Sequence, residues 1–121
     1  MKHSLLIAGL GIVSLVAVNS ASAADAAKGE AAFKKSCGAC HSVKAGEKKI
    51  GPNLAGIAGR AAGTEAGFKY SEGFTGVSWN AATLDKYLAD PKASFPKTKM
   101  TFAGVKDAAE RADIIAFLGV K

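Results

Sequence analysis

Apolar residues recur at helical spacing directly after Asp25, a residue type that often caps the N-terminus of a helix. Gly29, Phe33 and Cys37 follow at intervals of four residues, so they share one face of a helix that we expect to run to about Cys40. A glycine inside a helix costs about 1 kcal/mol relative to alanine. Gly29 therefore indicates either a point where another helix passes close or an indifferent surface position.

Two further helices are expected in the second half of the chain. Asn80 can cap a helix over residues 81–90. Asp107 and Glu110 have the spacing of a capping box and would open a last helix that continues to about Leu118. The apolar faces of these helices consist of Leu84, Tyr87 and Leu88 in one and of Ala108, Ala112, Ile115 and Leu118 in the other.

The segments between these helices are predicted to be loops. Residues 42–60 contain turn-forming glycine, proline and asparagine, and residues 59–76 are rich in glycine, with a short helical turn expected near residues 70–73. Pro91 is expected to end the second helix, and residues 93–103 to be extended. No segment favours a strand. The sequence therefore predicts an all-α fold with about three main helices, short helical turns and a high loop content.

The first residues of the chain have the pattern of an export signal. Lys2 supplies a positive charge, residues 5–18 are an apolar run of 14 residues, and residues 21–23 form a small-x-small cleavage pattern. The run is short of the ~20 residues that a membrane-spanning helix needs. We therefore expect residues 1–23 to be a cleaved signal peptide and residues 24–121 to be a single domain. An uncleaved membrane anchor is the alternative.

Removal of this leader would change the charge and the set of reactive side chains. The whole chain has a formal net charge of +6, and loss of Lys2 would lower it to +5. His41 and Met100 would be the only histidine and methionine left. An exported protein of this modest basic charge is not expected to bind nucleic acid. The two cysteines would enter an oxidising compartment, where a disulfide or covalent haem attachment can form.

The candidate chemistry lies at residues 37–41, where two cysteines three positions apart are followed at once by His41. This pattern is typical of c-type haem attachment. Residues i and i+3 lie on one face of a helical turn, so the sulfurs of Cys37 and Cys40 can reach the two vinyl groups of one porphyrin. His41 would then lie under the iron as an axial ligand. A haem would also supply apolar surface to a small domain with a modest core.

Three other interpretations of the cysteines remain open. A thioredoxin-like redox pair would need a preceding strand, whereas residues 28–36 are expected to be helical. A zinc site needs about four ligands, and two cysteines with one histidine fall short. A structural disulfide explains the cysteines but leaves His41 without a role.

Met100 is the one thioether available as a second axial ligand, and it lies in a segment expected to be non-helical. Ligation by histidine and methionine raises the reduction potential of a haem. The alternative role for Met100 is that of a flexible core residue. A ligand histidine usually donates its other ring N–H to a carbonyl or carboxylate, and the carbonyl of Pro52 is a candidate acceptor.

Several further motifs accompany the attachment pattern in a fixed order along the chain. They are Gly29-Glu30-x-x-Phe33 before it, and after it Ile50-Gly51-Pro52-Asn53-Leu54, Gly59-Arg60, Gly67-Phe68-Lys69-Tyr70, Trp79, residues 84–88 and residues 96–104. In this order the chain resembles the class I c-type cytochromes, and among them the group of mitochondrial cytochrome c and bacterial cytochrome c2. It departs from them at Lys97, where a glycine usually follows the proline, and between Tyr70 and Trp79, where it is about two residues shorter.

The resemblance implies a small, loop-rich cytochrome c fold wrapped around one covalently bound haem c. It implies His41 and Met100 as the metal ligands, with the carbonyl of Pro52 steadying His41. The other haem-binding residues that it implies are Arg60, Tyr70 and Trp79 at the haem propionates, and Tyr87 and Thr98 in the hydrogen-bond network around Met100.

The implied function is that of a soluble, monomeric, periplasmic electron carrier rather than an enzyme, with no stable insertion in a membrane. Its partners would be membrane or soluble redox proteins with acidic docking surfaces, such as a reductase complex, a terminal oxidase, a reaction centre or a peroxidase. The alternatives are a peroxidase-like haem enzyme or gas-binding protein with a labile sixth ligand, and an exported Cys-x-x-Cys thiol oxidoreductase. The lysines expected around the exposed haem edge are Lys34, Lys35, Lys44, Lys48, Lys49, Lys97 and Lys99.

Overall fold

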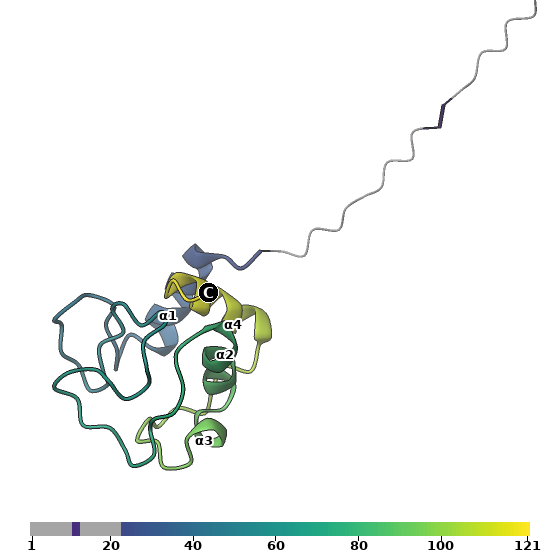
Figure 1. Cartoon of the computed structure of the whole chain (residues 1–121). Helices are drawn as coiled ribbons and strands as arrows, with labels where there is room; N and C mark the ends of the chain where they lie inside the picture. Colours follow the sequence, from purple (N-terminus) through teal and green to yellow (C-terminus); the bar gives the residue numbers. More distant parts are fainter. Residues whose placement is uncertain (1–10, 13–22) are drawn as a thin grey trace, which may run out of the picture.

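The computed structural model describes residues 11–12 and 23–121, so nearly all of the expected signal peptide lies outside the described residues. The described part of the chain contains four helices and no strand, with one isolated bridge between Ala61 and Ser78 (Figure 1). This confirms the all-α prediction. The helices are α1 (Ala26–Ser36), α2 (Ala81–Ala89), α3 (Pro91–Ser94) and α4 (Ala108–Phe117).

Helix α1 begins as expected but ends four residues early. The carboxylate of Asp25 accepts hydrogen bonds from the first-turn N–H groups of Ala27 and Lys28, at 2.9 and 3.2 Å. At the other end, the carbonyl of Phe33 accepts from the N–H groups of both Cys37 and Gly38, at 2.7 and 2.8 Å. The second of these bonds spans five residues, so it breaks the helical repeat before the cysteines are reached. The prediction that this helix extends to about Cys40 is therefore wrong.

Helix α1 packs closely against α4 because Gly29 has no side chain. A β-carbon built on Gly29 would overlap the backbone carbonyl of Asp113 on α4. On the same face, the rings of Phe33 and Phe117 lie 5.4 Å apart between centroids. The interpretation of Gly29 as a point of close helix approach is confirmed.

Helix α3 is a short element that corrects the prediction for the segment after Pro91. Pro91 does end α2, but it also occupies the first turn of α3, where the missing N–H of proline costs no hydrogen bond. Asp90 caps this helix by accepting from the N–H of Ala93 at 3.2 Å. Residues 93 and 94 are therefore helical rather than extended, and the irregular segment begins at Phe95.

The other two helices begin at the expected caps. Asn80 and Thr83 form a capping box on α2, with each side chain bonded to the backbone N–H of the other residue, at 2.9 and 3.0 Å. Asp107 caps α4 by accepting from the N–H groups of Ala109 and Glu110, at 2.8 and 3.2 Å. Asparagine and aspartate side chains accept these bonds well, which is why they mark helix starts in a sequence.

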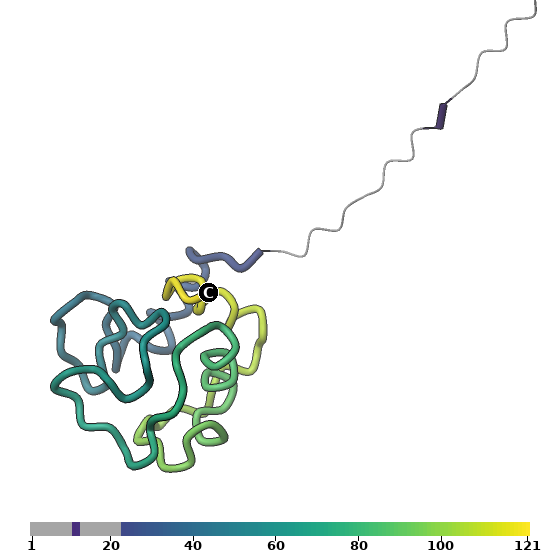
Figure 2. The backbone as a smooth tube through the Cα atoms, in the orientation of Figure 1, coloured from purple at the N-terminus to yellow at the C-terminus, as the bar shows by residue number. Residues whose placement is uncertain are grey.

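The long connection between α1 and α2 forms the half of the molecule away from α2 and α3, as Figure 2 shows by its blue-to-teal trace. Between this loop half and the helices lies an apolar core with an aromatic cluster in which Phe74 stacks on Phe95, with ring centroids 4.2 Å apart. Within the described ranges, no helix has the length and apolar character needed to cross a membrane. The buried core consists of Ile57, Ala62, Trp79, Leu84, Tyr87, Leu88, Phe95, Val105, Ile114, Ile115 and Val120.

Candidate haem site

The two cysteines lie in a single turn that follows α1. The carbonyl of Cys37 accepts from the N–H groups of Cys40 and His41, at 3.1 and 2.9 Å. Both thiols are free; Cys37 is half-buried and Cys40 is exposed. Burial raises the pKa of Cys37 to about 11, with smaller contributions from the charges of Glu110 and Cys40. The turn thus presents two unpaired sulfurs, and the first is held in its thiol form at neutral pH.

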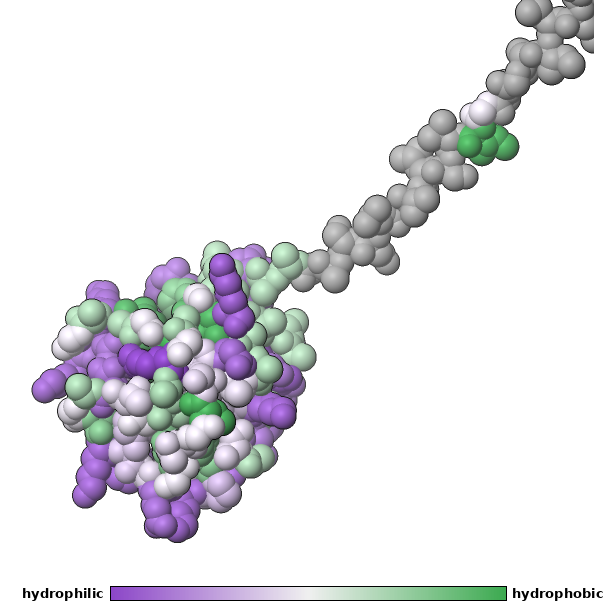
Figure 3. All heavy atoms as spheres, in the orientation of Figure 1, coloured by the Kyte–Doolittle hydropathy of each residue, from purple (hydrophilic) through white to green (hydrophobic). Residues whose placement is uncertain are grey.

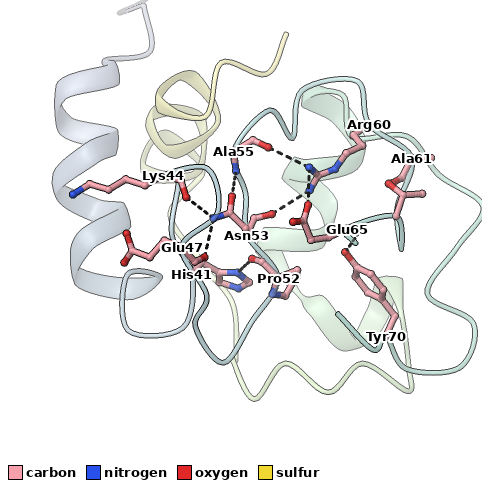
Figure 4. Close-up of polar contacts among 11 residues, drawn as sticks. His41, Lys44, Glu47, Pro52, Asn53, Ala55, Arg60, Ala61, Glu65 and Tyr70 are labelled. Atoms are coloured by element: carbon pink, nitrogen blue, oxygen red, sulfur yellow. Dashed lines mark hydrogen bonds and ion pairs between the residues drawn. The ribbon is translucent and has the colours of Figure 1, made fainter. Parts of the chain in front are cut away.

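The ring of His41 is fixed by a backbone carbonyl. Its Nδ1 lies 2.8 Å from the carbonyl oxygen of Pro52 (Figure 4). With the proton on Nδ1, that nitrogen donates to Pro52 and Nε2 keeps its lone pair for a metal. Burial lowers the pKa of His41, opposed by the bond to Pro52. The neutral imidazole, which is the form that binds metals, is therefore favoured.

Gly51 makes room for this ring, a role that the sequence analysis missed. A β-carbon on Gly51 would lie 2.5 Å from Cε1 and 2.9 Å from Nδ1 of His41. The Gly51 N–H also donates to the carbonyl of Cys40 at 2.8 Å, which holds the two segments together. The only signal in the sequence was a glycine next to Pro52, which is equally typical of an ordinary turn.

Asn53, the next residue after Pro52, anchors the loop that orients His41. Its side-chain amide donates to the carbonyls of Lys44 and Glu47, at 2.6 and 3.0 Å, and its side-chain oxygen accepts from the N–H of Ala55 at 2.8 Å (Figure 4). These three bonds fix the backbone on both sides of Pro52. The position of the His41 ring is therefore set by the loop as a whole.

Met100 is placed beside two other residues expected at the site. The hydroxyl of Tyr87, on α2, lies 3.2 Å from Oγ1 of Thr98 and 3.8 Å from the sulfur of Met100. The Met100 N–H donates to the same Thr98 hydroxyl at 3.3 Å. Burial raises the pKa of Tyr87, so its hydroxyl keeps its proton as a donor. Tyr87 therefore contacts the thioether of Met100, and Thr98 links the Tyr87 hydroxyl to the Met100 backbone.

Arg60 and Trp79, expected at the haem propionates, are joined through their backbones. The Trp79 N–H donates to the carbonyl of Arg60 at 2.9 Å, and the Gly59 N–H donates to the carbonyl of Trp79 at 2.8 Å. The Trp79 ring is buried against Tyr87, with centroids 5.2 Å apart. Trp79 therefore connects the part of the site near Arg60 with the part near Met100.

The guanidinium of Arg60 also contacts an acidic residue that the sequence analysis did not single out. Arg60 Nη1 lies 3.1 Å from Oε2 of Glu65, whose own N–H donates to the hydroxyl of Tyr70 at 3.1 Å (Figure 4). Glu65 therefore lies between Arg60 and Tyr70. In the sequence it is a single acid in a glycine-rich loop, and nothing local predicts its partner.

These features together define a class of protein. Two free thiols in one turn, a half-buried neutral imidazole with one nitrogen tied to a carbonyl, and a thioether from a distant segment fit the attachment and ligation of a c-type haem. No group of three or more His, Cys, Asp or Glu side chains in residues 11–12 and 23–121 is placed to hold a metal ion. The site and the all-α frame are those of a c-type haem protein.

Comparisons with known proteins agree with this class. The Cytochrome c family model matches residues 26–119. Cytochrome c2 iso-2 of Magnetospirillum fulvum is 55% identical over 84 residues, which cover 68% of this chain and 88% of that protein. Cytochrome c2 of Blastochloris viridis is 45% identical over 116 residues, covering 93% and 90%. The structure of cytochrome cH from Methylobacterium extorquens matches with a TM-score of 0.73 and 42% identity, over 80% of this chain and 99% of that one.

The chain belongs to the cytochrome c family. It is a c-type cytochrome that carries electrons, with one covalently attached haem c at Cys37 and Cys40. The resemblance inferred from the order of motifs is confirmed.

Proposed function

We propose that this cytochrome is a soluble, monomeric, periplasmic carrier of single electrons whose haem iron is held between His41 and Met100. The observation that carries the proposal is the placement of the Met100 sulfur 3.8 Å from the Tyr87 hydroxyl. Because Tyr87 is held by α2 and Thr98 bonds the backbone of Met100, this thioether has a defined position. The haem, when bound, supplies an iron that cycles between Fe(II) and Fe(III).

The side chains of this chain would then orient and protect the cofactor. Pro52 holds the imidazole of His41 in one orientation, which raises its basicity as a ligand. Met100 is a soft donor, and its thioether favours the reduced iron and raises the reduction potential. With both positions filled by the protein, O₂ and peroxide have no open coordination site. These roles suit electron transfer and oppose bond-making chemistry at the iron.

The main alternative is a haem enzyme or gas-binding protein in which Met100 is easily displaced. The contacts from Tyr87 and Thr98 argue against it, because displacement would require breaking the contact network around Met100. A thiol oxidoreductase is disfavoured by a different feature. A pKa of about 11 leaves the Cys37 thiol protonated, whereas such enzymes depend on a thiolate.

The proposed partners are redox proteins with acidic docking surfaces, such as a reductase complex, a terminal oxidase, a reaction centre or a peroxidase. All seven lysines expected around the haem edge are exposed, and Figure 3 shows hydrophilic side chains along the rim of the folded body. Three of them, Lys34, Lys49 and Lys97, pair with exposed glutamates. Such surface pairs are weak, so the lysines remain available to steer an acidic partner.

The proposed location rests on the sequence of the first 23 residues. We expect cleavage after Ala23, which would release residues 24–121 as the domain that folds around the haem. The first well-defined contact of the domain follows directly: the N–H of Asp25 donates to the carboxylate of Asp113 on α4 at 2.8 Å. The proposed cleavage site thus lies just before the folded part of the chain.

The test is the visible spectrum of the mature protein in both oxidation states, compared with that of Met100→Ala. The proposal expects a methionine–iron charge-transfer band in the ferric protein that Met100→Ala lacks, together with a lower reduction potential in the variant. The matched control is Met100→Leu, which keeps the apolar volume but removes the sulfur and should behave like the alanine variant. An unchanged spectrum and potential in both variants would show that Met100 is not a ligand.

A further inference from the structure

The guanidinium of Arg60 is fixed by three acceptors, of which one is charged. The carbonyls of Asn53 and Ala55 each accept a hydrogen bond from it at 3.1 Å. Oε2 of Glu65 lies 3.1 Å from Nη1, with the two side chains only about a quarter exposed (Figure 4). Glu65 therefore cancels the charge of Arg60 at short range, in surroundings where water screens the pair incompletely.

Glu65 is also tied to Tyr70 through its own backbone N–H, at 3.1 Å. Arg60 and Tyr70 are, with Trp79, the residues that the resemblance to class I c-type cytochromes assigns to the haem propionates. One acidic residue therefore touches both of them, and its backbone is fixed beside the place assigned to the propionates. The carboxylate of Glu65 thus contacts Arg60, while its backbone contacts Tyr70.

We infer that Glu65 is a positioning residue that lowers the reduction potential of the haem by neutralising Arg60. The inference rests on the proposed function and on the expected placement of Arg60 and Tyr70 at the propionates. A positive charge near the haem favours the added electron, and a negative charge opposes it. The ion pair of Glu65 and Arg60 can still donate hydrogen bonds through Arg60, but the pair has little net charge. The oxidised state of the haem is therefore favoured relative to a protein that lacks this glutamate.

A second glutamate in the same region provides a matched comparison. Glu72 pairs with Lys97 at 2.9 Å, but these side chains are 82% and 64% exposed. Water screens such a pair strongly. Removal of the charge at Glu72 changes the net charge of the protein by the same amount as removal at Glu65. The difference between the two variants therefore isolates the contact with Arg60 from the effect of net charge alone.

The experiment is a potentiometric titration of the haem in Glu65→Gln, Glu72→Gln and Glu65→Asp. Gln keeps the shape of Glu65 and can still accept from Arg60, so it removes the charge with little change in packing. At an ambient potential equal to the unsubstituted midpoint, we expect the Fe(II):Fe(III) ratio of Glu65→Gln to rise about threefold, or about 28 mV at 59 mV per tenfold change. Glu72→Gln should shift the ratio by less than half as much, and Glu65→Asp should stay near the unsubstituted value.

The inference is overturned if Glu65→Gln shifts the potential no more than Glu72→Gln, or if Glu65→Asp shifts it as far as Glu65→Gln. A purely structural role for Glu65 would give the latter result, because Asp keeps the charge but its side chain is one methylene shorter, which loosens the contact with Arg60. Failure of the proposed function would appear elsewhere, as a missing methionine–iron band in the unsubstituted protein. The comparison of Glu65→Gln with Glu72→Gln depends on the reduction potential alone. Failure of this inference can therefore be told apart from failure of the proposed function.

Discussion

Gly29→Ala is expected to destabilise this cytochrome even though alanine is the better helix former. A β-carbon at this position would overlap the carbonyl group of Asp113 and lie 3.0 Å from the backbone nitrogen of Ile114. These are backbone atoms of α4, so no side-chain rotation can make room. Helices α1 and α4 would have to separate, which would loosen the ring contact between Phe33 and Phe117.

The size of the effect follows from two opposing contributions. Overpacking a well-packed contact costs about 1–3 kcal/mol, and a clash with a rigid backbone belongs at the upper end of that range. Alanine in place of glycine inside a helix recovers about 1 kcal/mol. The expected net loss is therefore about 2 kcal/mol of unfolding free energy. In a domain of this size that corresponds to a fall in Tm of roughly 10 °C.

The assay is thermal and denaturant unfolding of the ferric protein, followed by circular dichroism and by the haem absorbance. Ala31→Gly is the matched control, because Ala31 is exposed in the middle of α1 and the change measures helix propensity without a packing effect. It should cost about 1 kcal/mol. If Gly29→Ala were as stable as the unsubstituted protein or more stable, helix propensity would outweigh the contact, and the packing argument would be refuted.

Two further predictions concern the His41 ring and the side chain of Arg111 on α4. Gly51→Ala should push the His41 ring off the carbonyl of Pro52. We expect the unfolding free energy of the ferric protein to fall by about 1 kcal/mol, the usual contribution of one hydrogen bond. The haem spectrum should also shift, which a change confined to the surface would not cause. Arg111→Met should cost about 2 kcal/mol in denaturant unfolding, because Arg111 is 13% exposed and donates to Asp85 at 2.7 Å and to a loop carbonyl. Lys34→Met, which breaks an exposed pair with Glu30, should cost below ~1 kcal/mol, and an equal loss in both variants would contradict the argument.

Helix starts could be predicted from the sequence because they depend on one side chain and the backbone next to it. Asp25, Asn80 and Asp107 each cap the helix that was expected to follow. Helix ends were less predictable. The end of α1 depends on the Phe33 carbonyl accepting two bonds at once, and no residue type marks that event. Pro91 was ambiguous because proline is equally suited to end one helix and to begin the next.

The residues of the site also fall into those that could be predicted from the sequence and those that could not. The cysteine pair, His41 and Met100 could be chosen as candidates because the chain offers so few sulfur and imidazole groups after the expected signal peptide. The carbonyl of Pro52 could be named because a ligand histidine needs an acceptor. Glu65 could not, since its ion pair depends on how the glycine-rich loop folds back towards Arg60. The space at Gly51 also depends on the approach of two segments that local sequence does not bring together.

The two proposed ligands belong to different halves of the molecule. His41 is anchored to the loop half through Pro52, whereas Met100 is anchored to α2 through Tyr87. Apart from the apolar core, the backbone bonds between Trp79, which lies just before α2, and the segment at Arg60 tie the loop half to the start of α2 near the site. A haem bound at both residues would therefore add a second connection across the molecule. Its covalent attachment at Cys37 and Cys40 ties that connection to the loop half, so loss of the Met100 bond should loosen residues 95–104 before it loosens residues 37–60.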